Sequence, residues 1–175
     1  MHMSSSPVIA APDHDTLSDT GRTAHLRTPE AVILVGLRLT AAGSSAAAEY
    51  WKRCGLQQGM NAADALVQVL AAGAADWAFN GVMSPDLTAD EKRVLAAIAA
   101  LQQARPLEMF DALSGALSGA AVRIALPLCQ DLADTARGAG LVLPDRRWRL
   151  PGPFTAGRTL RPPACCGRGV RYALH

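Results

Sequence analysis

The amino-acid sequence predicts an all-α fold: a compact, alanine-rich bundle of five or six short helices with a flexible N-terminus and a basic C-terminal tail. Three observations predict it. Residues 28–143 carry helix start and stop signals, twenty-eight alanines lie between Ala31 and Ala139, and no strand-like alternation of apolar and polar residues occurs there. Alanine favours helices but buries little area, so we expect closely spaced helix axes around a few large side chains.

The chain changes character at Pro144, and this change divides it into three segments. Residues 1–27 lack periodicity and are interpreted as a flexible N-terminal segment. Residues 28–143 form the predicted helical domain, and residues 144–175 form an Arg/Pro/Gly-rich tail that we expect to be disordered. Residues 1–143 carry ten Lys and Arg against fourteen Asp and Glu, whereas the tail carries seven Arg against one Asp. The net charge therefore changes from −4 to +6 at this point.

The first helix is expected to start at the Thr-Pro-Glu run at residues 28–30. The threonine can cap free amides, the proline suits the first helical position, and the glutamate favours the positive helix end. The residues that follow are apolar nearly all round except for Arg38, and the helix is expected to end near Gly43. This pattern predicts a central helix.

Two further helices are expected before residue 79. Ser44 or Ser45 can cap a short helix that Gly55 ends, and Asn61 can cap a longer one over residues 62–78. Large apolar residues recur along the longer helix at near-helical spacing: Leu66, Val69, Leu70 and Trp77.

The strongest local signal is a capping box at residues 88–91. In this motif the Thr88 hydroxyl accepts a hydrogen bond from the amide three residues on, and the Glu91 carboxylate accepts one from the threonine amide. The motif predicts a helix over residues 89–104. Pro106 is expected to start the next helix, which would carry four residues on one apolar face: Leu107, Phe110, Leu113 and Leu117.

The tetrapeptide Ala-Leu-Ser-Gly occurs twice in succession over residues 112–119. On one continuous helix, Gly115 and Gly119 would form a flat face that allows close backbone approach, at a cost of about 1 kcal/mol per glycine relative to alanine. Alternatively, the repeat breaks the helix and Ser118 caps a new one. Both interpretations are compatible with the fold class.

The last helix is expected over residues 120–137 in either case. Proline lacks an amide hydrogen, so Pro127 is expected to kink this helix or to start its second half. Gly138 and Gly140 would end it, because glycine readily adopts the left-handed conformation found at helix ends.

Composition bears on the cellular location. No apolar stretch reaches the roughly 20 residues that a membrane-spanning helix needs, because charged residues such as Arg38 and Asp76 interrupt the longest ones. The N-terminus lacks the basic and apolar regions of a secretory signal. We therefore expect a cytoplasmic protein that does not bind membranes and whose four cysteines are free thiols.

The residue types that carry catalysis and metal binding are poorly placed. All four histidines lie outside residues 28–143, which removes the commonest general base from the helical domain. Cys165 and Cys166 are adjacent but lack the second ligand pair of a zinc site, and Cys54 and Cys129 are typical of buried apolar thiols. We therefore expect no catalytic residue, no metal site and no cofactor.

Two sets of side chains are candidates for binding a partner. The first consists of large aromatic residues that we expect to be partly exposed anchors: Tyr50, Trp51 and Phe110. The second combines guanidinium charge with an aromatic ring at the start of the tail: Arg146, Arg147, Trp148 and Arg149.

These sets lead to two functional hypotheses. The preferred one is a non-enzymatic helical module for protein–protein interaction or self-association, so the partner is another protein or a second copy. The alternative is a nucleic-acid-associated regulator in which the basic tail supplies the affinity. Docking of the tail on the acidic domain and a tail without function also stay open.

Three segments carry a resemblance to a known family. They are the apolar opening helix with its arginine at Val32–Leu39, the run LTADEKRVLAAIAAL at Leu87–Leu101, and the run DLADTARGAGLVLP at Asp131–Pro144. Over residues 31–143 the chain resembles a family of small, uncharacterised bacterial all-helical proteins. The resemblance implies a helical fold and no known activity. A cysteine cluster precedes the helix cap in that family, whereas Phe79–Asp86 contains no cysteine, so no metal or redox role is carried over.

Overall fold

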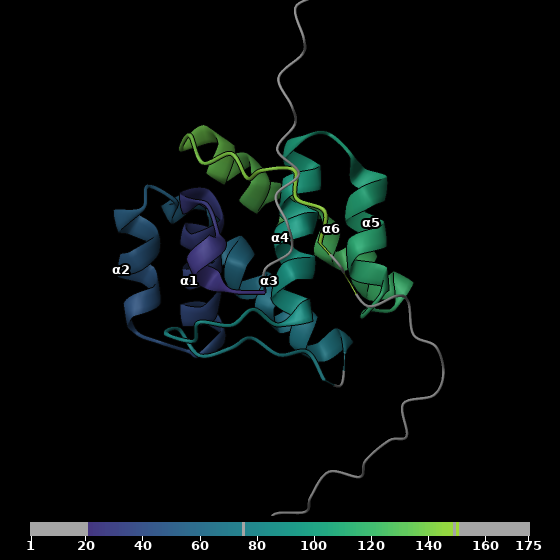
Figure 1. Ribbon diagram of the computed structural model, residues 1–175, viewed down its shortest axis with the longest axis horizontal. Helices are drawn as coiled ribbons and strands as arrows, with labels where there is room; N and C mark the ends of the chain where they lie inside the picture. The colour runs from purple at the N-terminus through teal and green to yellow at the C-terminus, as the bar shows by residue number, and fades with distance from the viewer. Residues whose placement is uncertain (1–20, 75, 149, 151–175) are drawn as a thin grey trace, which may run out of the picture.

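The computed structural model describes residues 21–74, 76–148 and 150, and it confirms the all-α fold (Figure 1). In chain order the elements are the 3-10 helix η1 (Thr23–His25), α1 (Thr28–Ala41), α2 (Ala46–Arg53), the 3-10 helix η2 (Gln57–Gly59), α3 (Met60–Gly73), α4 (Ala89–Gln102), α5 (Pro106–Ser114) and α6 (Gly119–Gly138). The only β pairing among the described residues is an isolated antiparallel bridge between Arg22 and Asp86.

Helix α4 lies at the centre of the bundle. Its second half, residues 97–102, is buried without interruption, and the helix packs against α1, α5 and α6. Helix α3 packs against α1 and α6, whereas α2 contacts α1 at one edge of the molecule and α5 lies towards the opposite edge (Figure 1). The two halves of the chain therefore share one core rather than forming separate domains.

Small residues let the helices approach closely around few large side chains. Trp51 is the largest fully buried side chain, and its ring lies against Gly36 of α1. A Cβ at Gly36 would lie 2.5 Å from the Trp51 Cζ2 atom. A Cβ at Gly73 of α3 would lie 3.0 Å from Ala121 on α6. Glycine at residue 36 is therefore a packing requirement, whereas at residue 73 a Cβ would make the contact with α6 tight.

Two of the predicted caps are present. The Thr88 hydroxyl accepts from the Glu91 amide at 3.0 Å, and the Thr88 amide donates to the Glu91 carboxylate at 2.8 Å. The Ser118 hydroxyl accepts from the Ala121 amide at 3.3 Å and begins α6. The second interpretation of the repeated tetrapeptide is therefore correct. Gly115 still serves close approach, because a Cβ there would overlap the Arg93 guanidinium.

Two predicted helix starts are wrong. Thr28 is the first residue of α1 rather than its cap. Arg27 is the cap residue instead, and its amide donates to the Glu30 carboxylate at 2.8 Å. Asn61 lies inside α3, because η2 leads directly into Met60 with helical backbone angles.

One predicted helix extent and one predicted apolar face are also wrong. Helix α3 ends at Gly73 rather than near residue 78, because the backbone becomes extended at Ala74 and Trp77 lies beyond the helix. On α5 the buried residues are Met109, Ala112 and Leu113, whereas Leu107 is 80 % exposed. Leu107 and Leu113 are six residues apart, which at 3.6 residues per turn places them on different sides of the helix.

The folded domain extends beyond residues 28–143 at both ends. The Thr23 amide donates to the Pro85 carbonyl and the Leu87 amide donates to the Gly21 carbonyl, each at 2.8 Å. At the other end, Leu143 is fully buried and Arg146 is buried too. The boundaries predicted at residues 27 and 144 therefore do not coincide with the ends of the fold. Residues 1–20 and 151–175, for which flexibility and disorder were expected, lie outside the described residues.

Candidate interaction site

The predicted aromatic anchors do not form one surface. On α2, Trp51 is fully buried and its indole Nε1 donates to the Thr40 hydroxyl at 3.1 Å. The prediction that Trp51 is a partly exposed anchor is therefore wrong, because Gly36 leaves a space in α1 that the indole fills. Tyr50 is half-buried, and its hydroxyl donates to the Val32 carbonyl at 3.1 Å. Burial raises the pKa of Tyr50, and the neighbouring Cys54 raises it further.

Phe110 lies elsewhere, on α5. It is half-buried against the core, and Leu107 lies three residues before it on the same helix. Residues three apart are neighbours on a helix surface, so the two side chains lie near one another on the outer side of α5. Three further large apolar side chains are exposed elsewhere, on α6 and in loops: Met83 (92 %), Ile124 (59 %) and Val142 (58 %).

The residues of the predicted basic set have different environments in the structure. Arg146 forms a bidentate ion pair with Glu30 of α1, in which Nε and Nη2 each donate to the carboxylate at 2.9 Å. Both side chains are only 2 % exposed. Arg146 therefore supports the fold and cannot meet a partner while this pair holds. Arg147 is exposed, and Trp148 is half-buried with the Arg146 guanidinium 5.0 Å and the Lys92 ammonium 5.7 Å from its ring centroid.

Three residues singled out in the tail lie outside the described residues: Arg149, Cys165 and Cys166.

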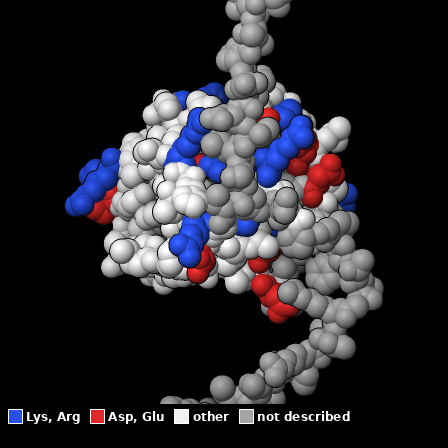
Figure 2. All heavy atoms as spheres, viewed as in Figure 1, with Lys and Arg blue, Asp and Glu red and all other residues white. Residues whose placement is uncertain are grey.

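Surface charges lie largely in pairs of opposite sign. Figure 2 shows basic and acidic side chains in adjacent small groups on the face in view. Arg53 contacts Glu49 at 2.9 Å, Arg137 contacts Asp134 at 2.8 Å, and Arg105 contacts both Glu108 and Asp145. Such exposed pairs contribute about 0–1 kcal/mol each. On these elements neighbouring acids offset the positive charge.

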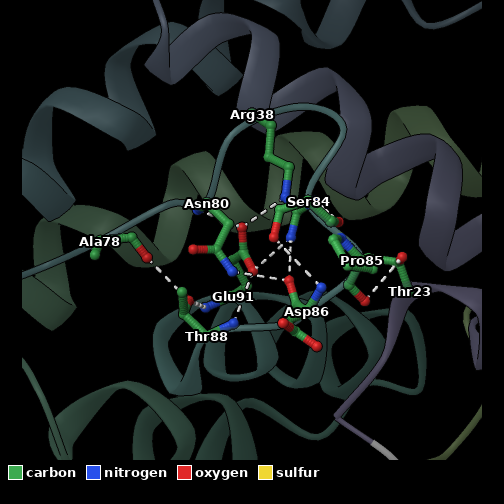
Figure 3. A network of polar contacts seen from close by, with 9 residues as sticks. All are labelled: Thr23, Arg38, Ala78, Asn80, Ser84, Pro85, Asp86, Thr88 and Glu91. Atoms are coloured by element: carbon green, nitrogen blue, oxygen red, sulfur yellow. Dashed lines mark hydrogen bonds and ion pairs between the residues drawn. The ribbon is translucent and has the colours of Figure 1, made fainter.

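A buried ion pair between Arg38 of α1 and Glu91 of α4 was not predicted (Figure 3). Arg38 Nε donates to Glu91 Oε1 at 2.7 Å, and Nη2 donates to Glu91 Oε2 at 2.9 Å. The remaining guanidinium donors bind the loop between α3 and α4, reaching the carbonyl oxygens of Ser84 at 2.8 Å and Asp86 at 2.7 Å. Arg38 thus joins two helices to one loop.

Glu91 completes this network from the other side. Besides closing the capping box with Thr88, it accepts from the Asn80 amide at 2.9 Å, and the Asn80 side chain donates to the Asp86 carbonyl at 2.8 Å. A signal for the pair was present in the sequence. Arg38 is the only charged residue between Ala31 and Ala41, and a buried charge needs an opposite charge and hydrogen bonds.

One open hollow of about 750 Å³ lies where the end of α2 and η2 meet the end of α6. Its lining residues are Lys52, Gly55, Gln57, Gln58, Asp131, Asp134, Thr135, Gly138 and Ala139. In the part of the chain that the structure describes, no group of three or more His, Cys, Asp or Glu side chains is placed to hold a metal ion.

Comparisons with family models, curated proteins and solved structures found no match to this chain. The resemblance to bacterial all-helical proteins therefore stays a prediction. Among the described residues, none of the helices has both the length and the apolar character needed to cross a membrane.

Proposed function

We propose that this protein is a non-enzymatic helical interaction module that associates with another protein or with a second copy through the outer side of α5. The observation that carries the proposal is Leu107, which is 80 % exposed on a helix where the half-buried Phe110 is its neighbour. Full burial of a leucine side chain contributes about 1.5–3 kcal/mol. A few residues supply most of the binding energy at protein interfaces, and aromatic side chains such as that of Phe110 are enriched there.

Light scattering coupled to size exclusion tests self-association over a range of protein concentrations. We expect the wild-type mass to rise above that of one chain, and Leu107→Glu to return it to one chain, because a carboxylate would lose its hydration in an apolar interface. Ala48→Glu is the matched control, since Ala48 is an exposed helical residue on α2, near the other edge of the bundle. A wild-type monomer at every concentration that also captures no partner would contradict the proposal.

The nucleic-acid alternative is supported by the exposed Arg147 and the half-buried Trp148, which lie just before the Arg-rich residues 151–175. Its test is binding of a labelled oligonucleotide at several salt concentrations, because neutralisation of phosphates makes affinity fall with salt. The deletion should begin at residue 151 and not at 144, because Arg146 is part of the fold. Binding that is unaffected by salt or by this deletion would rule the alternative out.

The proposed location is the cytoplasm. The unpaired thiols of Cys54 and Cys129 support it, because reduced cysteines are typical of that compartment. Fluorescence microscopy of a tagged full-length chain tests this location.

A further inference from the structure

The segment after α6 returns across the bundle without forming a helix or a strand. We call residues 143–148 the strap; its course after α6 appears in yellow-green in Figure 1. The strap begins at Leu143, which is fully buried, and its amide donates to the Gln102 side chain at 2.7 Å. Gln102 also donates to the Leu141 carbonyl at 2.9 Å, so the last residue of α4 binds the chain where it returns from α6.

Charged side chains of the strap then form ion pairs with the rest of the fold. Asp145 contacts Arg105 at 2.9 Å, and Arg146 forms its buried pair with Glu30 while Nη2 also donates to the His25 carbonyl at 3.2 Å. We call Glu30, Lys92, Gln102 and Arg105, together with the His25 carbonyl, the seat. All of them lie on α1, on α4 or next to these helices, and none lies on α6, which carries the strap. Gln102 also donates to the Ala133 carbonyl of α6 at 3.3 Å, so α6, which stays in place when the strap is exchanged, helps to position this residue of the seat.

A glycine-containing hinge joins the strap to α6. Gly138 is the last residue of the helix, Ala139 is exposed, and Gly140 has a φ of +77°. A Cβ at Gly138 or at Gly140 would meet nothing within 4 Å, and the backbone at residues 139–141 is held by amide hydrogen bonds to the last turn of α6, which a movement of the hinge would have to break. Large φ and ψ changes are absorbed at a few element-terminal positions of this kind.

We infer that the strap of one copy can occupy the seat of a second copy, and that two chains can form a dimer by reciprocal strap exchange. Every contact between strap and seat would be the same within one chain and between two, so the two arrangements differ chiefly in the entropy of chain connection and in the hinge. Attachment in one chain gives the strap an effective concentration on the order of millimolar, which favours the monomer in dilute solution. The population of the exchanged dimer therefore increases as the protein concentration rises or as the hinge is shortened.

This inference rests on the self-association part of the proposed function but uses a different surface. Self-association through Leu107 on α5 and exchange of the strap can fail independently. Experiments on the strap in a Leu107→Glu background therefore separate them.

Charge complementation tests the exchange directly. Glu30→Arg alone and Arg146→Glu alone each place like charges together in the seat, both within a chain and between identical chains. An equimolar mixture offers two matched pairs only between different chains. In the Leu107→Glu background we expect each variant alone to give the mass of one chain and the mixture to give twice that mass, with an untagged copy retained by a tagged one.

The double variant Glu30→Arg/Arg146→Glu is the matched control, because it restores the opposite charges within one chain. If single variants do not fold alone, they are unfolded together in urea and refolded as a mixture. Mixtures that remain at the mass of one chain, while the double variant folds, would overturn the inference. So would a mixed dimer that is lost in the Leu107→Glu background, because α5 would then hold the two chains together.

A chain with residues 138–140 deleted provides a second measurement that alters no charge. The deletion removes about 10 Å of chain reach between α6 and the strap, which disfavours docking on the seat of the same chain, so we expect a dimer at concentrations where wild type is monomeric. A monomer with a protease-sensitive strap would overturn the inference.

Discussion

Gly36 gives Trp51 its place in the core. The indole ring passes so close to α1 that any side chain at residue 36 would overlap it, and the indole nitrogen then reaches the Thr40 hydroxyl. The Thr40 hydroxyl in turn donates to the Gly36 carbonyl at 2.9 Å. One glycine therefore determines how α2 packs on α1, in a core where few other side chains are large.

At this scale we predict that Gly36→Ala destabilises the protein by about 1–3 kcal/mol, because the Cβ would lie 2.5 Å from Trp51 Cζ2 and must displace the ring. Urea unfolding followed by circular dichroism measures the loss. Gly119→Ala is the control, since a Cβ there meets nothing within 4 Å. Equal unfolding midpoints for the two variants would show that the ring can move freely.

Cys129 provides a second residue-scale prediction, which concerns pH. Complete burial raises the pKa of its thiol from 9.0 to about 12. The unfolded chain therefore loses this proton at lower pH than the folded chain, and stability present below about pH 9 should be lost between about pH 9 and 12. At pH 10 the loss from this thiol is about 1 kcal/mol.

Unfolding in urea at pH 7 and pH 10, with a reductant, measures this loss. Cys129→Ala should reduce the difference in the free energy of unfolding between pH 7 and pH 10, and Cys54→Ala should reduce it less. A difference that is the same in wild type and in Cys129→Ala would show that other groups, such as Tyr50, account for it.

At the scale of elements, Glu91 links local structure to tertiary structure. It closes the capping box that starts α4, it neutralises Arg38 of α1, and with Asn80 it holds the loop before α4. The loop thus owes its conformation to two charged side chains beneath it, although one of its side chains, Met83, is nearly fully exposed. Removal of the charge should therefore affect both helices and the loop.

We predict that Glu91→Gln destabilises by about 3–5 kcal/mol, because Arg38 would stay buried without its counter-charge. Thr88→Ala removes the cap and the hydrogen bond from the Thr88 hydroxyl to the Ala78 carbonyl, and should cost about 1–2 kcal/mol. Glu49→Gln breaks the exposed pair with Arg53 and should cost less than about 1 kcal/mol. Thermal unfolding of the three variants measures the order, and a Thr88→Ala effect larger than that of Glu91→Gln would contradict it.

At the scale of the whole molecule, the strap joins the two ends of the described chain. The Glu30–Arg146 pair spans 116 residues in sequence and fastens the strap at the start of α1. The preceding turn, η1, contributes the His25 carbonyl to the same guanidinium. The start of α1 and the end of the fold therefore depend on one another.

This dependence predicts different outcomes for two truncations. A chain that ends at Leu150 keeps the strap, whereas one that ends at Leu143 should be less stable than it by at least about 1.5–3 kcal/mol, because the charge-assisted hydrogen bonds between Arg146 and Glu30 are lost. Chemical unfolding of both chains measures the difference. Arg147→Ala is the matched point control, since Arg147 is exposed, and should have little effect. Equal stability of the two truncations would show that the strap is not part of the cooperative unit.

Local sequence patterns were sufficient to predict the helices but not to predict which side chains are exposed. The Thr88–Glu91 motif and the Ser118 cap involve residues three apart, so the sequence alone predicts where α4 and α6 begin. Trp51 was expected to be exposed because no local pattern reveals that Gly36 makes room for it. The same limitation applies to α5, where Leu107 was placed on the buried face and is exposed. Of the candidate interaction residues, Tyr50, Phe110 and Trp148 are half-buried and Arg147 is exposed.

The sequence by itself determined the all-α class and most helix ends, because capping and helix propensity act within one or two turns. Only the tertiary structure decided which buried charges pair. Arg38 and Glu91 are 53 residues apart and Arg146 and Glu30 are 116 apart, distances over which no periodicity extends. The charge change at Pro144 is a real property of the sequence, but the fold continues past it. Burial of a cation requires a buried anion, and α1 supplies one to Arg146.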